Sequence, residues 1–151
     1  MRQRILQKKI IFSSFLFCFL SILACGSSGE RTQSVSVTTA SGEYTFRAEL
    51  ADNQGLRELG LMNRTDLTDE SAMLFVWTQD TQGGFWMKDT PTSLDIIFIS
   101  SNMSVNYIAA NAVPYSTDVI LPLSPYRYVL EVKAGFVERS GLNLGDSVQL
   151  R

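Results

Sequence analysis

The sequence contains no histidine, and both of its cysteines, Cys18 and Cys25, lie within the first 25 residues. Without histidine, the chain cannot build a Ser-His-Asp or Cys-His catalytic group, or a histidine-based zinc or iron site. Without a cysteine after residue 25, the rest of the chain has neither a disulfide nor a thiol nucleophile. The candidate chemistry is therefore limited mainly to carboxylates, aromatic side chains and methionines.

The first 24 residues have the layout of a secretory signal. Residues 1–9 contain four basic side chains and no acidic one, and residues 10–24 form an apolar run that is short for a membrane span. The run ends in Ile22-Leu23-Ala24-Cys25, which resembles the bacterial lipobox, in which the cysteine is diacylated and becomes the new N-terminus. We expect a lipoprotein signal peptide over 1–24 and a lipidated Cys25 that holds an exported protein on a membrane of the bacterial cell envelope. The alternatives are an ordinary signal peptide and a retained anchor.

Residues 25–34 are small and polar, which predicts a flexible tether between the membrane and a folded domain over 35–151. Residues 25–151 carry 9 basic and 15 acidic side chains, a net charge of −6. An acidic balance of this size disfavours nucleic acid as a partner and disfavours binding to an anionic membrane surface.

The hydrophobic pattern predicts a mainly β domain. Alternating or continuous apolar segments predict strands over 35–39, 44–50, 72–77, 94–99, 105–110, 126–132 and 147–150, with shorter extended segments at 85–87 and 119–121. The first two strands are expected to form a hairpin, and so are the segments at 72–77 and 85–87. Because no βαβ alternation is visible, we predict a single compact antiparallel β-sandwich or rolled barrel with one or two short helices.

Two short helices are expected. The first covers 53–61, with Asp52 as its N-cap and with Leu56, Leu59 and Leu61 facing the core. The second covers 134–140 and ends at Gly141 in a left-handed conformation.

Several short motifs follow one another along the chain. They are Gly60-Leu61-Met62, Met73-Leu74-Phe75, Phe85-Trp86-Met87-Lys88-Asp89-Thr90, Leu94-Asp95, Asn111-Ala112-Val113-Pro114, Tyr128-Val129-Leu130-Glu131 and Gly145-Asp146. This ordered series resembles the DUF192 family. The resemblance covers residues 35–151 and implies a compact β-rich domain, usually exported or membrane-anchored, whose biochemical role is not established. The family usually has asparagine where this chain has Asp89, and a carboxylate cannot donate the hydrogen bond that an amide can.

Asp95 and Glu131 are carboxylates inside otherwise apolar strands. One interpretation makes them a general acid and base for hydrolysis of a cell-wall or carbohydrate substrate. The alternative is that each is neutralised by backbone amides of the loop 89–93 or by a buried cation. The candidate cations for such pairing are Arg64, Lys88, Arg127 and Lys133.

Trp86 lies just after two glycines, and Trp77 and Tyr128 are its expected neighbours. It could stack on a sugar ring or a peptide side chain, with Lys88 and Asp89 at the rim, or it could belong to the core. Arg64 and Lys88 could bind an anionic group or pair with nearby carboxylates. The predicted ligand-binding set is Arg64, Trp86, Lys88, Asp89, Thr90, Asp95 and Glu131.

The methionines offer a third interpretation. Met62, Met73 and Met87 could form a thioether site for Cu(I), although methionine more often fills gaps in a core. We expect no bound cofactor. The preferred hypothesis is a non-enzymatic binding or accessory module for an envelope ligand or protein partner, ahead of a hydrolase that uses Asp95 and Glu131 and of a Cu(I) carrier.

Overall fold

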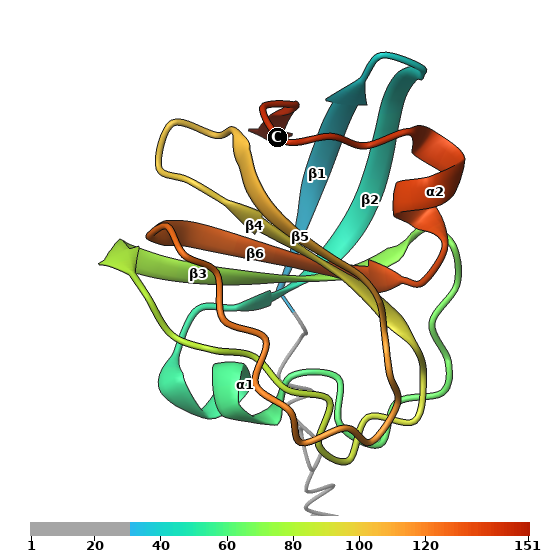
Figure 1. The fold of residues 1–151 in the computed structure, drawn as a ribbon, viewed down its shortest axis with the longest axis vertical. Coiled ribbons are helices and arrows are strands. Elements are labelled where there is room, and N and C mark those ends of the chain that lie inside the picture. Colours follow the sequence, from blue (N-terminus) through green and yellow to red (C-terminus); the bar gives the residue numbers. More distant parts are fainter. Residues whose placement is uncertain (1–30) are drawn as a thin grey trace, which may run out of the picture.

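A computed structural model describes residues 31–151 of the chain. The signal peptide predicted over 1–24 and the lipidation of Cys25 lie outside these residues. The described part contains seven strands and two short helices (Figure 1). In chain order the elements are β1 (Thr32–Thr39), β2 (Gly42–Ala51), α1 (Gln54–Leu59), β3 (Ser71–Thr81), β4 (Leu94–Ile99), β5 (Val105–Ala112), β6 (Tyr126–Lys133), α2 (Phe136–Ser140) and β7 (Ser147–Leu150).

All seven strands belong to one sheet, in the order β5-β4-β6-β3-β2-β1-β7. The sheet curls into a half-barrel, so the rolled arrangement is confirmed and the domain is not a two-sheet sandwich (Figure 1). Its two edges approach each other beside β5 and β7, where Val105 N donates to Asp146 O at 2.9 Å and Val148 N donates to Met103 O at 2.9 Å. These bonds satisfy backbone groups that a free edge would leave exposed.

The strand pairing differs from the expected one in two places. The β1–β2 hairpin is present, but β2 and β3 are parallel, because α1 and the loop that follows it carry the chain back to the starting end of the sheet. The hairpin expected between 72–77 and 85–87 does not form. Instead β6 lies between β3 and β4, and Phe85 pairs only with Ile120 through an isolated bridge. A local apolar pattern cannot predict that β6, from much later in the chain, inserts between β3 and β4.

Helix α1 also departs from the expectation. Its N-cap is Asn53, whose side chain accepts from Leu56 N at 3.0 Å, whereas Asp52 pairs with Arg31. No residue of the helix is buried: Leu56 is 37% exposed and Leu59 is 55% exposed. Of the three leucines expected in the core, only Leu61 is there. Helix α2 ends as predicted, at a left-handed Gly141.

Two core clusters cover the two faces of the sheet. The barrel core receives a buried side chain from every strand and from α2, so it fills the concave side of the curl. The outer core lies on the opposite face of β3, β6 and β4 and contains Phe75, Ile96, Phe98, Tyr126 and Val129. Segments 60–70, 82–93 and 112–120, which contribute Leu61, Leu67, Met87 and Ala112, cover this face. The candidate site lies on this outer side.

Candidate functional site

An open pocket of about 350 Å³ lies between α1 and the segment 81–86. Helix α1 and residues 59–62 form one side, residues 81–86 form the other, and residues of β3 and β6 form the floor. The lining residues are Gln54, Arg57, Glu58, Leu59, Gly60, Leu61, Met62, Phe75, Trp77, Thr81, Gly83, Gly84, Phe85, Trp86, Thr90, Tyr126 and Glu131. Apart from Glu131, the floor is aromatic.

Segment 83–86 is held in place by hydrogen bonds to the segment around Ile120 and to β6. Phe85 N donates to Ile120 O at 2.9 Å, and Ile120 N donates to Phe85 O at 2.8 Å. The Tyr126 hydroxyl donates to Gly83 O at 2.9 Å. A Cβ atom on Gly84 would clash with Cγ1 of the exposed Val119 side chain, which would have to move. This side of the pocket is therefore fixed by the fold.

Edge-to-face contacts connect the aromatic side chains of the floor. Trp77 lies 5.3 Å from Tyr126, and Phe85 lies 5.1 Å from Phe75, measured between ring centroids. Each such contact is worth about 0.5–1.5 kcal/mol beyond the area it buries. Arg57 from α1 lies over the Trp77 ring at 5.3 Å and donates to Val76 O at 3.0 Å, which ties the helix to β3.

Glu131 is the one ionisable carboxyl among the floor residues of the pocket, and the residue is only 5% exposed. Its side chain makes no hydrogen bond or ion pair with any of residues 31–151. Its cross-strand neighbours are Met73 on β3 and Ile96 on β4, so both flanks are apolar. Burial away from water disfavours the charged form and raises the pKa of Glu131 to about 8. The pocket thus ends in a carboxyl that holds a proton near neutral pH.

Asp95 has a different environment. It is fully buried, and its two carboxylate oxygens accept from Asn111 N at 2.7 Å and from Val137 N at 2.8 Å. Asp95 is paired with Val132 in the β4–β6 register, whereas Glu131 is paired with Ile96. Cross-strand partners share a face and successive residues alternate, so the two carboxylates point to opposite faces of the sheet. They do not face a common cleft, and backbone amides satisfy Asp95.

The motif from Trp86 to Thr90 contributes a half-exposed indole, a buried threonine and an exposed carboxylate. Trp86 is 50% exposed at the rim of the pocket, and Lys88 Nζ lies 5.7 Å from the centre of its ring. Thr90 is buried, lines the pocket and donates to Lys88 O at 3.2 Å. Asp89 is exposed, with φ at 54°, and its side chain makes no hydrogen bond within 31–151. Since asparagine and aspartate both tolerate this left-handed conformation, backbone geometry accounts for the residue type.

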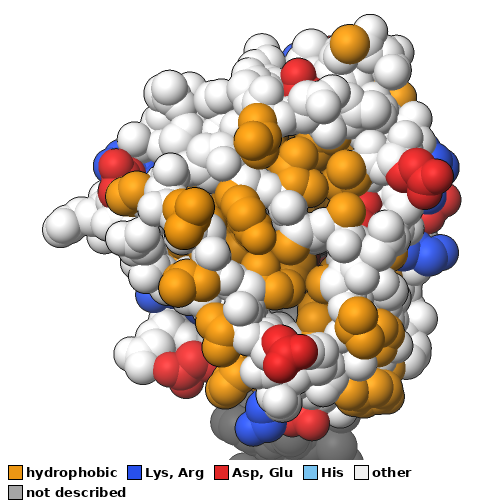
Figure 2. Space-filling model, in the orientation of Figure 1, with side chains coloured by type: hydrophobic (Ala, Val, Ile, Leu, Met, Phe, Trp, Pro, Cys, Tyr) orange, Lys and Arg blue, Asp and Glu red, His pale blue; other side chains and the backbone are white. Residues whose placement is uncertain are grey.

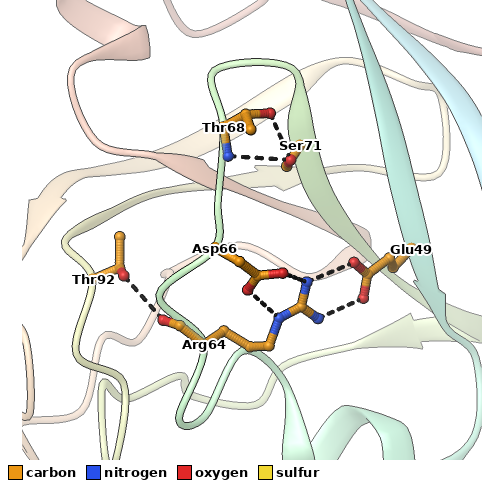
Figure 3. Close-up of polar contacts among 6 residues, drawn as sticks. All are labelled: Glu49, Arg64, Asp66, Thr68, Ser71 and Thr92. Atoms are coloured by element: carbon orange, nitrogen blue, oxygen red, sulfur yellow. Dashed lines mark hydrogen bonds and ion pairs between the residues drawn. The ribbon is translucent and has the colours of Figure 1, made fainter.

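Arg64 lies outside the pocket and is bound by two carboxylates (Figure 3). It forms two hydrogen bonds with Glu49, at 2.9 and 3.0 Å, and two with Asp66, at 2.6 and 3.0 Å. Glu49, followed by Asp66, raises the pKa of the guanidinium further, and the guanidinium lowers the pKa of Asp66. With both edges of its planar group engaged, Arg64 has its charge balanced within the protein.

The three methionines proposed for Cu(I) do not share one environment. Met73 and Met87 are buried in the outer core, whereas Met62 is partly exposed and lines the pocket. Within residues 31–151, no group of three or more acidic, histidine or cysteine side chains could hold a metal ion. In the same part of the chain, no helix has the length and apolar composition needed to cross a membrane.

The structure also brings residues to the site that the sequence did not single out. Phe75 and Tyr126 belong to strands, where aromatic residues normally indicate core, and Arg57 belongs to α1. Of the two expected neighbours of Trp86, Trp77 lines the pocket and Tyr128 does not. Hydrophobic side chains gather across the middle of the face shown in Figure 2. One segment, 113–123, contributes five of the exposed large apolar side chains of the described chain: Val113, Tyr115, Val119, Leu121 and Leu123.

Comparison with known proteins places the chain in a family. The model of the DUF192 family, described as "Uncharacterized ACR", matches residues 35–150. This chain belongs to the DUF192 family. No curated protein matches it.

Two solved structures of similar proteins have the same fold. A protein of unknown function from Novosphingobium aromaticivorans is 40% identical, with a TM-score of 0.78 over 82% of this chain and 89% of that one. A protein from Sinorhizobium meliloti, described as a candidate transcription regulator, is 36% identical, with a TM-score of 0.78 over 83% of this chain and 98% of that one. Because the match covers 98% of the Sinorhizobium meliloti chain, that chain is folded with little beyond the DUF192 domain. This supports experiments on residues 31–151 alone.

Proposed function

We propose that the protein is a lipid-anchored binding module of the bacterial cell envelope, and that the pocket between α1 and segment 81–86 holds a small ligand. The observation that carries the proposal is the pocket itself, which combines aromatic and aliphatic walls with one buried carboxyl at its floor. Ligand sites are commonly largely apolar cavities of this size with a few polar groups that fix orientation. Trp86 at the rim and Leu59 on the opposite side offer exposed apolar surface at the entrance.

The binding proposal is tested with the domain over residues 31–151. The immobilised domain is incubated with the small-molecule fraction of a cell-envelope extract, and native mass spectrometry identifies what it retains. We expect Trp86→Ala to lower retention at least tenfold. Leu144→Ala removes another exposed apolar side chain, one that does not line the pocket, so it should retain ligand as the wild type does. Equal retention by Trp86→Ala and wild type would exclude this pocket as the site.

The anchor proposal rests on the sequence around Cys25. If Cys25 is acylated, full-length protein labelled with a palmitate analogue should carry the label and sediment with membranes. Cys25→Ser should lose the label and leave the membrane fraction, whereas Cys18→Ser should behave as the wild type. Two or three acyl chains would give stable attachment, because a single chain binds only marginally. Label on Cys25→Ser would exclude this cysteine as the acylation site.

Nucleic acid is not the proposed ligand, although one solved relative is described as a candidate transcription regulator. Residues 25–151 carry 9 basic and 15 acidic side chains, and Arg64 is engaged by two carboxylates. A basic surface that could neutralise phosphates is the usual requirement for such binding. We expect no change in the polarisation of a fluorescent DNA duplex when the domain is added at moderate salt.

A second candidate function is acid catalysis by Glu131 alone. A carboxyl that keeps its proton near neutral pH inside an open pocket has the property that a general acid needs. Asp95 cannot serve as its partner because it lies on the other face of the sheet. Release of soluble fragments from purified peptidoglycan by wild type but not by Glu131→Gln would support this function. Equal release by both would exclude it.

A further inference from the structure

We propose that the ligand of this pocket carries an ammonium group, which enters between the aromatic side chains and pairs with the Glu131 carboxylate. This inference rests on the proposed binding function and adds the chemical class of the ligand. A small organic ammonium, primary or quaternary, is the chemistry that the floor of the pocket is built to recognise.

The first argument is that nothing in the described protein pairs with Glu131. An uncompensated buried carboxylate is costly, so a carboxyl in such a place must be neutral or must meet a positive partner. Arg57 lines the pocket but is fixed on the Trp77 ring and on the Val76 carbonyl. Lys88 is not among the lining residues and lies over Trp86. Among residues 31–151 Glu131 therefore has no positive partner, so a cation that pairs with its carboxylate has to come from a ligand.

The second argument is the composition of the walls. Phe75, Trp77, Phe85, Trp86 and Tyr126 line the same pocket as Glu131. The faces of aromatic rings attract cations, and cages of several rings with a nearby carboxylate suit alkylammonium groups in particular. An anionic ligand would be repelled as soon as Glu131 lost its proton, and a neutral apolar ligand would leave the carboxyl without a partner. An ammonium group satisfies the rings and the carboxyl together.

The third argument concerns the proton. Glu131 holds a proton in the empty pocket near neutral pH, because burial raises its pKa to about 8. When an ammonium ion enters, Glu131 loses this proton to solvent and the resulting carboxylate pairs with the cation. The other titratable or charged groups of the pocket are Arg57 and Glu58 from α1 and Tyr126 from β6. Burial raises the pKa of Tyr126 above its ordinary value, so it does not lose a proton in this range.

Two pairs of probes of matched shape test the proposal on residues 31–151. Choline is compared with 3,3-dimethylbutan-1-ol, and benzylammonium with benzyl alcohol, by calorimetry and by NMR shift mapping. In at least one pair, we expect the cation to bind tenfold or more tightly than its neutral counterpart. As the pH increases toward 8, the affinity for choline should rise by up to about tenfold per pH unit, and binding should release up to one proton. Choline keeps its charge throughout, so this slope reports the protein.

Variants separate the roles of the groups. Glu131→Gln keeps the shape of the side chain and should remove both the preference for the cation and the pH slope. Glu138→Gln removes an exposed carboxylate on α2 that does not line the pocket and should change neither. Retention of the cation preference in Glu131→Gln would overturn the proposal. The melting temperature of each variant confirms that it is folded.

Failure of this inference and failure of the proposed function give different results. If the neutral probes shift pocket resonances and bind as tightly as the cations, the pocket is a ligand site and only the ammonium assignment is wrong. If none of the four probes binds, the ammonium assignment is also wrong. The binding function is then decided by whether envelope molecules are retained in a Trp86-dependent way.

Discussion

Asp95 on β4 and Glu131 on β6 lie next to each other in the strand register and point to opposite faces of the sheet. Asp95 faces the barrel core and binds the backbone of α2 and of residue 111, whereas Glu131 faces the pocket on the outer side. The Asp95 carboxylate links β4 to α2 and to residue 111, whereas the Glu131 carboxyl is available to a ligand in the pocket. The following predictions depend on this division of roles.

Asp95→Asn should destabilise the domain while leaving the pocket unchanged. An asparagine offers only one carbonyl oxygen, and its amide group would face the N–H of either Asn111 or Val137. Leaving a buried backbone donor unsatisfied and losing a charge-assisted bond should cost about 3 kcal/mol. Urea unfolding measures the loss, with the exposed Asp118→Asn as the matched control. An unchanged unfolding free energy would show that these two bonds do not hold α2 in place.

Glu131 should make the domain less stable as the pH rises. The pKa of Glu131 is about 8 in the folded protein, against an ordinary value of 4.5. Between these values the folded state holds a proton that the unfolded state has released, so raising the pH favours unfolding by up to about 1.4 kcal/mol per pH unit. Unfolding free energies of wild type and Glu131→Gln, measured from pH 4 to 9, should diverge over this range. Parallel curves would show that Glu131 is ionised at neutral pH.

Trp86 and Trp77 should respond differently to the same substitution. Trp86 is half exposed and lies at the rim, so Trp86→Ala should lower the unfolding free energy by less than about 1 kcal/mol. Trp77 contacts Phe75, Phe85 and Tyr126, and Trp77→Ala should cost about 3 kcal/mol or more. Thermal and urea unfolding of the two variants gives the comparison. A large loss in Trp86→Ala would assign this indole to the core and remove it as a binding residue.

Local sequence signals determined part of the fold. The alternation of Phe46 and Ala48 with polar residues predicts β2 and its hairpin with β1, and Gly141 correctly predicts the end of α2. The parallel pairing of β2 with β3 was missed, because it depends on where the chain returns after α1 and not on any short pattern. Leu56 and Leu59 were placed in the core by helical periodicity, yet the periodicity does not show which side of the helix the sheet covers.

The site was predictable only in part for the same reason. Trp86, Thr90 and Glu131 line the pocket. The sequence singles out Trp86 because it lies just after two glycines and Glu131 because it is a carboxylate inside an apolar strand. Arg64 and Asp95 were grouped with them on chemistry alone, but their partners are Glu49 and backbone amides from distant segments. Phe75 and Tyr126 gave no signal, because an aromatic residue in a strand looks the same whether it lines a core or a cavity.

Arg64→Lys should not preserve the function of the guanidinium. The planar group of Arg64 makes paired bonds with Glu49 and also with Asp66, and an ammonium group cannot match both geometries (Figure 3). We expect a loss of about 1–3 kcal/mol, because the Glu49 side chain is only 18% exposed and would lose part of its compensation. Asp66→Asn should cost less, since Asp66 is largely exposed. Equal stability of Arg64→Lys and wild type in urea would show that charge alone is sufficient here.

Substitutions of Asp89 test why the family usually has asparagine at this position. Its backbone has φ at 54°, its side chain is exposed, and its carbonyl accepts from Asn63 N at 2.7 Å. If backbone conformation is the requirement, Asp89→Asn should leave stability unchanged, because both residues tolerate the left-handed region. Asp89→Ala should cost about 1 kcal/mol, and Asp89→Val should cost more because a branched Cβ is disfavoured there. The unfolding free energies of the three variants decide the point. If Asp89→Asn were clearly more stable than wild type and Asp89→Ala were neutral, a side-chain hydrogen bond, and not the backbone, would explain the asparagine.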